Sequence, residues 1–264
     1  MGRLALVESR SARGDFAVPW RRVSVIAAGV AALLAVLYLA ARETPLFAVR
    51  TVEITGGSKA VNKAAREAAQ PVEGESLVAL DGKSLMRELE ALPSIRSASY
   101  DRAFPSTLRI FVRPELPLGI VRLGPDRWVV SERGRIIRRY APGSSERYPR
   151  FRLPGRPNVV PGSYLTDPGA RVVLGALAVV SRSFPVRIHM VRLEEGRLTM
   201  DLRAPWGTPE LRLGEAVDVK VKLAVAAVVL RSLSAEARSS VDYVDVSVPE
   251  RTVVGSNPQV EGLG

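Results

Sequence analysis

The chain has 264 residues and a net charge of +11 at pH 7, because 38 Lys and Arg outnumber 27 Asp and Glu. It contains no cysteine and one histidine, which excludes disulfide frameworks, thiol nucleophiles, iron–sulfur clusters and two-histidine metal sites. Apolar residues make up 47% of the chain, which is enough for packed cores. We therefore expect an anchor plus one or two domains of about 100–150 residues, with no metal and no cofactor.

Residues 23–41 (VSVIAAGVAALLAVLYLAA) form an apolar run without a charge, with arginines on both sides. As a helix this run would span about 28 Å, which is close to the hydrocarbon thickness of a bilayer. Tyr38 or Leu39 stands where a signal-peptide cleavage site needs a small residue, so the run predicts an uncleaved, single-pass transmembrane helix. The predominantly basic residues 1–22 then predict a short cytoplasmic tail, with the rest of the chain outside the cytoplasm.

Residues 46–115 predict a first module with the order β-α-α-β-β. Its expected elements are a strand over 47–55, a helix from a Ser58 cap to Pro71, a helix from an Asp81 cap to Pro93, and strands over 95–102 and 107–113. Leu85 and Leu89 should pack the second helix on alternate residues of the last strand, which are Leu108, Ile110 and Val112.

Residues 116–250 predict a mixed β domain with flanking helices, so the whole chain is of the α+β class. The expected elements are strands over 118–123, 127–131 and 135–139, a proline-rich loop over 141–163, a helix over 167–181, strands over 186–193, 197–202 and 210–213, a helix over 215–233 and a strand over 241–248. Residues 251–264 are expected to be a flexible tail.

Catalytic motifs are weak throughout the sequence, and we expect no enzyme. Gly82-Lys83-Ser84 has the end of a phosphate-binding loop, but Leu77 stands where the first glycine belongs, so a helix cap is the better interpretation. His189 lies in the middle of a predicted strand, and Glu194 and Glu195 lie at a predicted turn. The arginines form no stripe and match no nucleic-acid-binding motif, so the positive charge indicates a solvated surface or attraction to anionic headgroups or wall polymers.

Four segments resemble the FtsQ/DivIB family of bacterial cell-division proteins and its POTRA (polypeptide-transport-associated) domain. They are FAVRTVEITG at 47–56, GESLVALD at 74–81, LPSI at 92–95 and FPSTLRI at 104–110. The resemblance continues through Leu213-Gly214, a helix with Lys222-Leu223, and VDVSVP at 244–249. The chain departs from the family at Pro114, where the family usually has a glutamate.

The resemblance implies a non-enzymatic divisome scaffold at the septum of the cytoplasmic membrane. Its implied partners are FtsB-like (DivIC-like) and FtsL-like bitopic proteins and the septal peptidoglycan synthase complex, with no nucleic acid. The alternatives are a membrane-anchored extracytoplasmic hydrolase, which needs a clustered Ser/Lys or carboxylate pair, and a POTRA-containing assembly or transport factor. The last needs a long C-terminal series of strands, whereas residues 205–240 have a helical pattern.

A binding protein of this kind can use the edge of a β-sheet, which offers unpaired backbone groups to an incoming strand. The alternation in the last predicted strand, together with the resemblance, predicts partner binding by Tyr243, Val244, Asp245, Val246, Ser247 and Val248. Tyr243 is the expected anchor because a large ring contributes much contact area. The secondary candidates lie on the last strand of the first module and are Arg109, Phe111 and Arg113.

Overall fold

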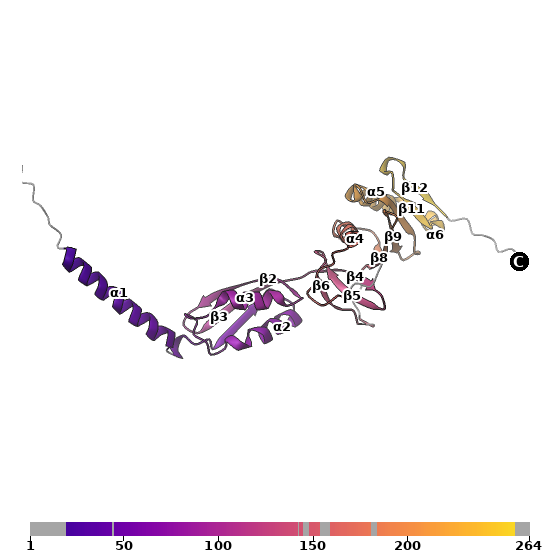
Figure 1. Ribbon diagram of the computed structural model, residues 1–264. Helices are drawn as coiled ribbons and strands as arrows, with labels where there is room; N and C mark the ends of the chain where they lie inside the picture. Colours follow the sequence, from indigo (N-terminus) through magenta and orange to yellow (C-terminus); the bar gives the residue numbers. More distant parts are fainter. Residues whose placement is uncertain are drawn as a thin grey trace, which may run out of the picture.

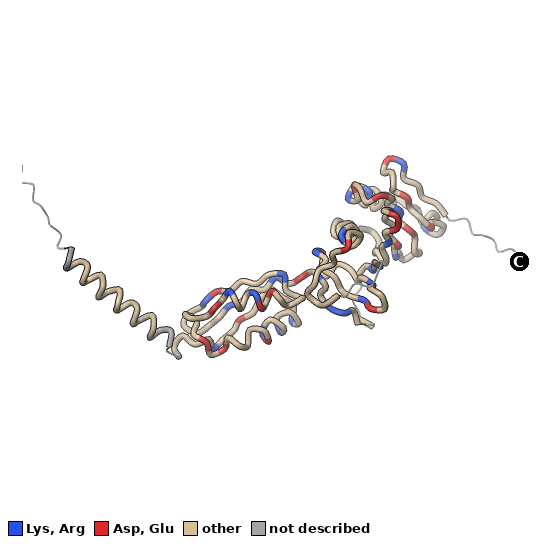
Figure 2. Tube along the Cα trace, viewed as in Figure 1, with Lys and Arg blue, Asp and Glu red and all other residues tan. Residues whose placement is uncertain are grey.

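The computed structural model of the chain describes residues 20–43, 45–141, 143–144, 148–153, 159–180 and 184–256. A long helix, a first domain that begins near residue 45 and a second domain that begins near residue 115 follow one another along an elongated molecule (Figure 1). Basic and acidic residues are interspersed over both domains (Figure 2). The combination of helices with mixed sheets confirms the α+β class.

The apolar run near the start lies within α1 (Trp20–Glu43), a helix of 24 residues. α1 extends beyond the run on both sides and so includes the charged residues Arg21, Arg22, Arg42 and Glu43. Among the described residues, no helix combines the length and the apolar character needed to cross a membrane, so the transmembrane helix expected over 23–41 is not found. The cytoplasmic tail expected at 1–22 lies almost wholly outside the described residues.

The first domain is a three-stranded sheet that packs against two helices. Its elements are η1 (Pro45–Phe47), β1 (Thr51–Thr55), α2 (Lys59–Ala69), η2 (Gln70–Val72), α3 (Gly82–Ala91), β2 (Ile95–Ala103) and β3 (Thr107–Pro114). The sheet order is β1-β3-β2, with β1 parallel and β2 antiparallel to β3. Leu85 and Leu89 of α3 are buried in one core with alternate residues of β3, as the sequence predicted: Leu108, Ile110 and Val112.

Side-chain caps determine where the two helices of the first domain begin. Ser58 Oγ accepts a hydrogen bond from the Val61 amide at 3.4 Å. Asp81 Oδ1 accepts from the amides of Lys83 and Ser84, at 3.1 and 3.2 Å. These amides lie in the first helical turn and have no acceptor within their own helix, so the caps satisfy them. The Gly-Lys-Ser sequence is thus the capped start of α3.

The second domain is built on a nine-stranded sheet. Its elements are β4 (Pro117–Leu123), β5 (Asp126–Ser131), β6 (Ile136–Arg139), β7 (Arg150–Arg152), α4 (Pro168–Ala178), β8 (Arg187–Glu194), β9 (Arg197–Arg203), β10 (Glu210–Glu215), α5 (Val219–Ser232), α6 (Ala235–Ser240), β11 (Tyr243–Asp245), η3 (Pro249–Arg251) and β12 (Val253–Gly255). The sheet order is β12-β11-β10-β9-β8-β7-β4-β5-β6. The pairs β4–β7, β7–β8 and β10–β11 are parallel, and the others are antiparallel.

α4 and α5 pack on the sheet through one shared core. Leu174 and Leu177 of α4 and Leu223 and Leu230 of α5 are buried together with alternate residues of the strands. A smaller cluster forms apart from this core, on β4, β5 and β6, and comprises Ile120, Val129, Ile137 and Tyr140. The intervening residues of each strand therefore face away from α4 and α5. Arg122, Arg192 and Arg212 lie on this outer face.

Three short elements differ from the sequence predictions. β7 lies within the expected loop over 141–163 and inserts between β4 and β8, with Phe151 buried. The strand expected over 241–248 is reduced to β11, and β12 forms within the segment expected to be a flexible tail. Elements of three residues leave little periodicity in a sequence, and they form here because neighbouring strands supply their hydrogen-bond partners.

A buried acidic residue lies at the junction of the two domains. Glu115 directly follows Pro114 at the end of β3, and 2% of its side chain is exposed. Its carboxylate lies 3.7 Å from Arg133 and 4.0 Å from Arg135, both on the β5–β6 hairpin. Its amide donates to the Ser94 carbonyl at 2.9 Å, so Glu115 contacts both domains.

Candidate partner-binding edge

The candidate catalytic side chains of the second domain, His189, Glu194 and Glu195, lie in an ordinary strand and turn. The described residues hold no group of three or more His, Cys, Asp or Glu side chains placed to bind a metal. His189 is half-buried in β8, away from the turn that follows. Glu194 ends β8, and Glu195 adopts a φ of 50° in the turn to β9. These residues therefore stand where the sequence predicted a strand and a turn.

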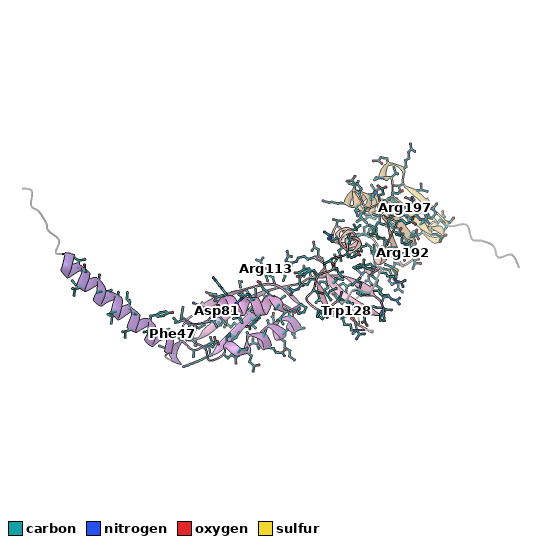
Figure 3. The ribbon with its side chains drawn as sticks, in the orientation of Figure 1. Phe47, Asp81, Arg113, Trp128, Arg192 and Arg197 are labelled. Carbon is teal, nitrogen blue, oxygen red and sulfur yellow. The ribbon has the colours of Figure 1, made fainter. Side chains whose placement is uncertain are left out.

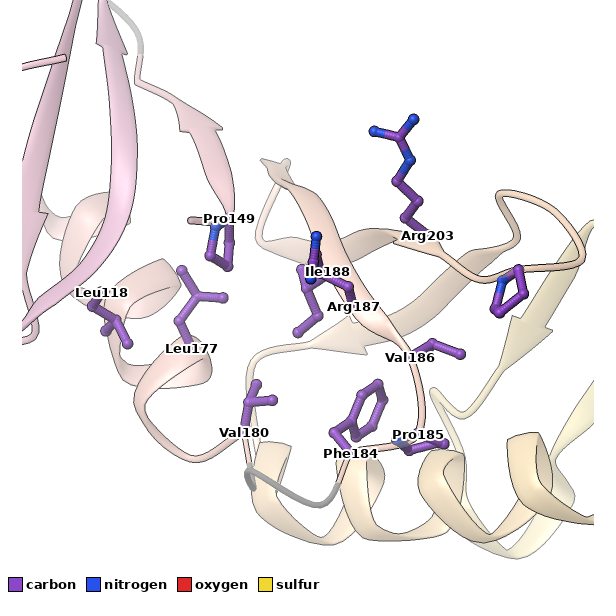
Figure 4. Close-up of a pocket in the computed structure, with 11 residues that line it drawn as sticks. Leu118, Pro149, Leu177, Val180, Phe184, Pro185, Val186, Arg187, Ile188 and Arg203 are labelled. Carbon is purple, nitrogen blue, oxygen red and sulfur yellow. The ribbon is translucent and has the colours of Figure 1, made fainter. Parts of the chain in front are cut away.

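An apolar pocket of about 480 Å³ lies between the end of α4 and the start of β8. Leu177 and Val180 face Phe184 and Ile188 across it, whereas the Arg203 guanidinium points away (Figure 4). The residues described as lining this pocket carry no carboxylate, hydroxyl or imidazole group. The Ser/Lys and carboxylate groups that the hydrolase alternative needs line a different pocket, of about 720 Å³, which includes Lys222, Ser247 and Asp245. There Lys222 Nζ donates to the Leu213 and Glu215 carbonyls, and the Ser247 hydroxyl donates to Asp245.

The structure corrects the expected position of the C-terminal strand edge. β11 lies inside the sheet, parallel to β10 on one side and antiparallel to β12 on the other. Val244 and Val246 are fully buried, whereas Val248 is 50% exposed. The chain turns back at η3, so β12 covers the side of β11 that the sequence predicted to be open.

A tight turn ends β11. The amide and hydroxyl groups of Ser247 both donate to Asp245 Oδ1, at 2.9 and 2.6 Å. Gly214 of β10 lies directly against this turn, because a Cβ there would come within 2.8 Å of the Ser247 Cβ. Gly214 also has a φ of 65°, which a glycine adopts without strain. The Leu-Gly step at 213–214 therefore makes room for the chain reversal that creates β12.

Tyr243 is held within the sheet face and is half-buried. Its ring lies under the Arg212 guanidinium, with 4.1 Å from the Arg212 Cζ to the ring centroid. Gly255 of β12 lies opposite Tyr243, and a Cβ there would come within 2.5 Å of the Tyr243 hydroxyl. The ring therefore fills the space between Arg212 and Gly255, and Tyr243 supports the edge strand rather than forming it.

Charged side chains link the strands on the same face. Arg192 donates to Asp201 at 2.6 and 3.0 Å and to Glu210 at 3.2 Å, and Arg212 donates to Glu210 at 2.7 Å. The hydrogen bond with Glu210 raises the pKa of the Arg212 guanidinium above its ordinary value, against the opposing effect of burial. Figure 3 shows Arg192 with Arg197 in the part of the second domain remote from α1. Together these contacts brace β8, β9 and β10 beside the terminal strands.

The outer sides of three edge strands carry hydrogen-bond partners. On β1, the Arg66 guanidinium donates to the Val52 carbonyl at 2.9 Å. On β2, the Ala98 amide donates to Glu90 Oε1 at 3.1 Å. On β6, the Ile136 amide donates to the Ser163 carbonyl, and the Gly162 amide donates back to Ile136, both at 2.8 Å.

β12 is the contrasting edge strand. Among the described residues it pairs with β11 on one side and with no strand on the other. Val253 and Val254 are 51% and 37% exposed. β12 consists of these two residues and Gly255, so it contains no charged residue or proline that would hinder pairing with another strand. β12 is therefore the edge best suited to receive another strand.

The secondary candidates on the first domain are not at an edge. β3 is the central strand of its sheet, so β1 and β2 already use its backbone groups. Arg109, Phe111 and Arg113 are exposed on the face away from the helices, and Arg109 donates to Glu53 at 3.1 Å. They can contribute side-chain contacts, but strand addition to β3 is blocked.

Sequence reasoning missed Val253, Val254 and Gly255 as edge residues. The signal was present in Thr-Val-Val-Gly at 252–255, a β-branched run between Pro249 and a glycine. The run is short, and its position after a proline favoured the interpretation as a tail. Its role became visible only through pairing with β11.

Comparison with known proteins identifies the first domain. Residues 47–113 match the model of the POTRA domain, FtsQ-type. The chain is also similar to the cell division protein FtsQ of Corynebacterium glutamicum, with 25% identity over 115 residues. That alignment covers 44% of this chain and 52% of the relative, so it spans about half the length of the relative.

Proposed function

Because the FtsQ-type POTRA match and the similarity to an FtsQ support membership in the FtsQ/DivIB family, we propose that the chain is a non-enzymatic scaffold of the division septum. In this proposal its two domains act outside the cytoplasm, in association with the cytoplasmic membrane. They bind FtsB-like (DivIC-like) and FtsL-like proteins and connect them to the septal peptidoglycan synthase complex. The similarity to an FtsQ supports a cell-division role, and the partners and the mechanism are further parts of our proposal.

The observation that carries the proposed mechanism is the open edge of β12. A partner strand aligned on β12 would extend the nine-stranded sheet to ten, and its main chain would satisfy the backbone groups of β12. The other edges are less suited, because Arg66, Glu90 and the segment 162–165 already supply partners to them. The predicted residues 243–248 then contribute from the second row, since Tyr243 and Asp245 lie on β11 and support β12, which separates them from the docked strand.

The side chains beside β12 define what the partner strand should present. Val253 lies opposite Asp245 on the face of the charged network, and Val254 lies opposite buried Val244 on the other face. A partner strand with alternating side chains would therefore meet Val253 on one face, with Asp245 and then Arg212 behind it in the same row. We expect it to carry an apolar side chain there, with a polar group beside it.

Two neighbouring proline substitutions test strand addition, because consecutive amides of a strand point to opposite edges. One of Val253→Pro and Val254→Pro removes an amide directed to β11 and should lower stability. The other removes an amide directed outward and should leave the protein folded while weakening partner capture. The measurement is a pull-down of a purified FtsB-like/FtsL-like complex by the full-length chain in detergent, with thermal melts in parallel.

Ala235→Pro is the matched control. Ala235 is exposed at the first position of α6, after the Ser234 cap, where proline needs no hydrogen-bond donor. It should change neither folding nor binding. If the two β12 variants both melt and bind as the unsubstituted protein does, strand addition at β12 is wrong. Uniform membrane fluorescence of a tagged chain in dividing cells, rather than midcell recruitment, would contradict the septal role itself.

A further inference from the structure

A row of arginines without a carboxylate partner among the described residues crosses three adjacent strands of the second domain. Arg127 of β5 lies directly opposite Arg122 of β4, and Arg122 lies directly opposite Arg152 of β7. All three side chains are exposed. Like charges in directly opposed positions of neighbouring strands destabilise a sheet. The arrangement is therefore unfavourable for the isolated domain, and a bound anionic partner would relieve the repulsion.

On the same face of the sheet, another arginine has its charge neutralised by carboxylates. Arg192, on the next strand along, is paired with Asp201 and Glu210. In the described part of the chain, by contrast, Arg122, Arg127 and Arg152 form no ion pair. Arg122 donates to the Gly124 carbonyl, at 3.2 Å. The repulsion within the row is thus not relieved by a carboxylate of the described residues.

The arginine row borders a concave surface with an apolar floor. The cavity has a volume of about 530 Å³ and is lined by five arginines and one acidic residue, Glu194. Ile120 and Met190 lie opposite Arg150 on its two neighbouring strands and line the floor. Ile120 is almost fully buried there, and Met190 is half-buried. We call this surface, made of Ile120, Arg122, Arg127, Arg150, Arg152 and Met190, the arginine groove.

We propose that the arginine groove binds an acidic segment of a partner protein, at a place separate from β12. β4, β5 and β7 lie at the far end of the sheet order from β12, so one partner strand on β12 leaves the groove free. Guanidinium groups bind carboxylates through paired, charge-assisted hydrogen bonds, and the floor accepts an apolar side chain between them. The segment should therefore alternate Asp or Glu with apolar residues.

Two observations favour a peptide over a phosphate polymer or a lipid surface. The half-buried Met190 in the floor offers apolar contact that a polyphosphate chain cannot use. The groove is also concave rather than a flat basic face, and a bilayer surface is too broad to enter it. The chain's own C-terminal residues 257–264 are poor occupants, because Glu261 is their one acidic side chain.

The probe for this proposal is a fluorescent octapeptide of alternating Glu and Leu, titrated with the full-length protein in detergent. Its lysine–leucine counterpart is the charge control. We expect the double variant Arg122→Gln/Arg152→Gln to bind the acidic peptide about tenfold more weakly. Raising the salt from about 0.05 M to about 0.5 M should remove most of the binding by the unsubstituted protein. The double variant should melt at the same or a higher temperature, because repulsion is relieved.

Arg171→Gln/Lys220→Gln is the matched control, because both residues are exposed, on α4 and α5, and the substitutions remove two positive charges from the same domain. It should change the affinity less than about twofold. The β12 proline variant that weakens partner capture should still bind the peptide, so failure of the groove and failure of the edge are distinguishable. Equal affinity of the double variant and the unsubstituted protein would overturn the proposal. So would arginine-dependent binding of inorganic polyphosphate or phosphatidylglycerol vesicles without binding of the peptide.

Discussion

Arg135 Nη1, on the β5–β6 hairpin of the second domain, donates a hydrogen bond of 2.5 Å to the carbonyl oxygen of Ile95 at the start of β2 in the first domain. Its other terminal nitrogen, Nη2, reaches the Glu90 carbonyl at 2.8 Å and the Ala91 carbonyl at 3.3 Å, where α3 ends. A guanidinium satisfies the free carbonyls of a helix C-terminus and interacts favourably with its dipole. One buried side chain therefore joins the two domains.

Replacing this side chain should loosen the junction. Arg135 and Glu115 have 7% and 2% of their side chains exposed, so Arg135→Met leaves a buried carboxylate without its nearest buried partner. We expect the free energy of unfolding to fall by about 3–5 kcal/mol in denaturant titrations. Adding Glu115→Leu should recover part of the loss. The control Arg133→Met, at a side chain that is 40% exposed, should lower it by no more than about 1 kcal/mol. Equal losses for the two arginines would contradict this account of the junction.

The core of the first domain gives a second prediction. Leu89 is fully buried between α3 and the sheet, so Leu89→Ala should destabilise the protein by about 2–5 kcal/mol through lost burial and a cavity. Leu116→Ala, at a side chain that is 64% exposed, is the control and should stay within about 0.5 kcal/mol of the original protein. Thermal and chemical unfolding measure both. An unchanged melt for Leu89→Ala would mean that α3 does not pack as described.

Tyr243 should act on binding through the position of β12. Tyr243→Ala removes the ring between Arg212 and Gly255, and with it a cation–π contact of about 0.5–1 kcal/mol. We expect weaker capture of the FtsB-like/FtsL-like partner and a slightly lower melting temperature. Tyr243→Phe keeps the ring and should retain the binding. If both variants lost binding equally, the hydroxyl would be a direct contact and the supporting role would be wrong.

Gly214 tests the turn that makes β12 possible. Gly214→Ala places a Cβ within 2.8 Å of the Ser247 Cβ, at a backbone φ of 65°. We expect a loss of about 1–3 kcal/mol in stability. Gly175→Ala is the matched control, because Gly175 lies within α4 with open space around it. That substitution should raise stability by about 0.5–1 kcal/mol. A neutral Gly214→Ala would show that the turn accommodates a side chain.

Local signals in the sequence were sufficient for most of the first domain. Ser58 and Asp81 cap helices in the structure because short polar side chains satisfy free amides a few residues away, which depends on nothing distant. The alternation of Leu108, Ile110 and Val112 with exposed residues gave the face of β3 for the same reason. The absence of a disulfide and the match of ordered motifs to the FtsQ-type POTRA domain were likewise properties of the residues alone.

The identity of the free edge was decided only by the tertiary structure. A sequence shows that residues 243–248 alternate, but whether a strand lies inside a sheet depends on which other segments pair with it. Val253 and Val254 became the edge because the Ser247–Asp245 turn and η3 return the chain antiparallel to β11. The row of Arg127, Arg122 and Arg152 likewise exists only through register, since strands that are distant in the chain bring like charges into opposition. Caps and alternation act within a few residues, whereas edges and cross-strand rows are set by hydrogen bonds between segments far apart in the sequence.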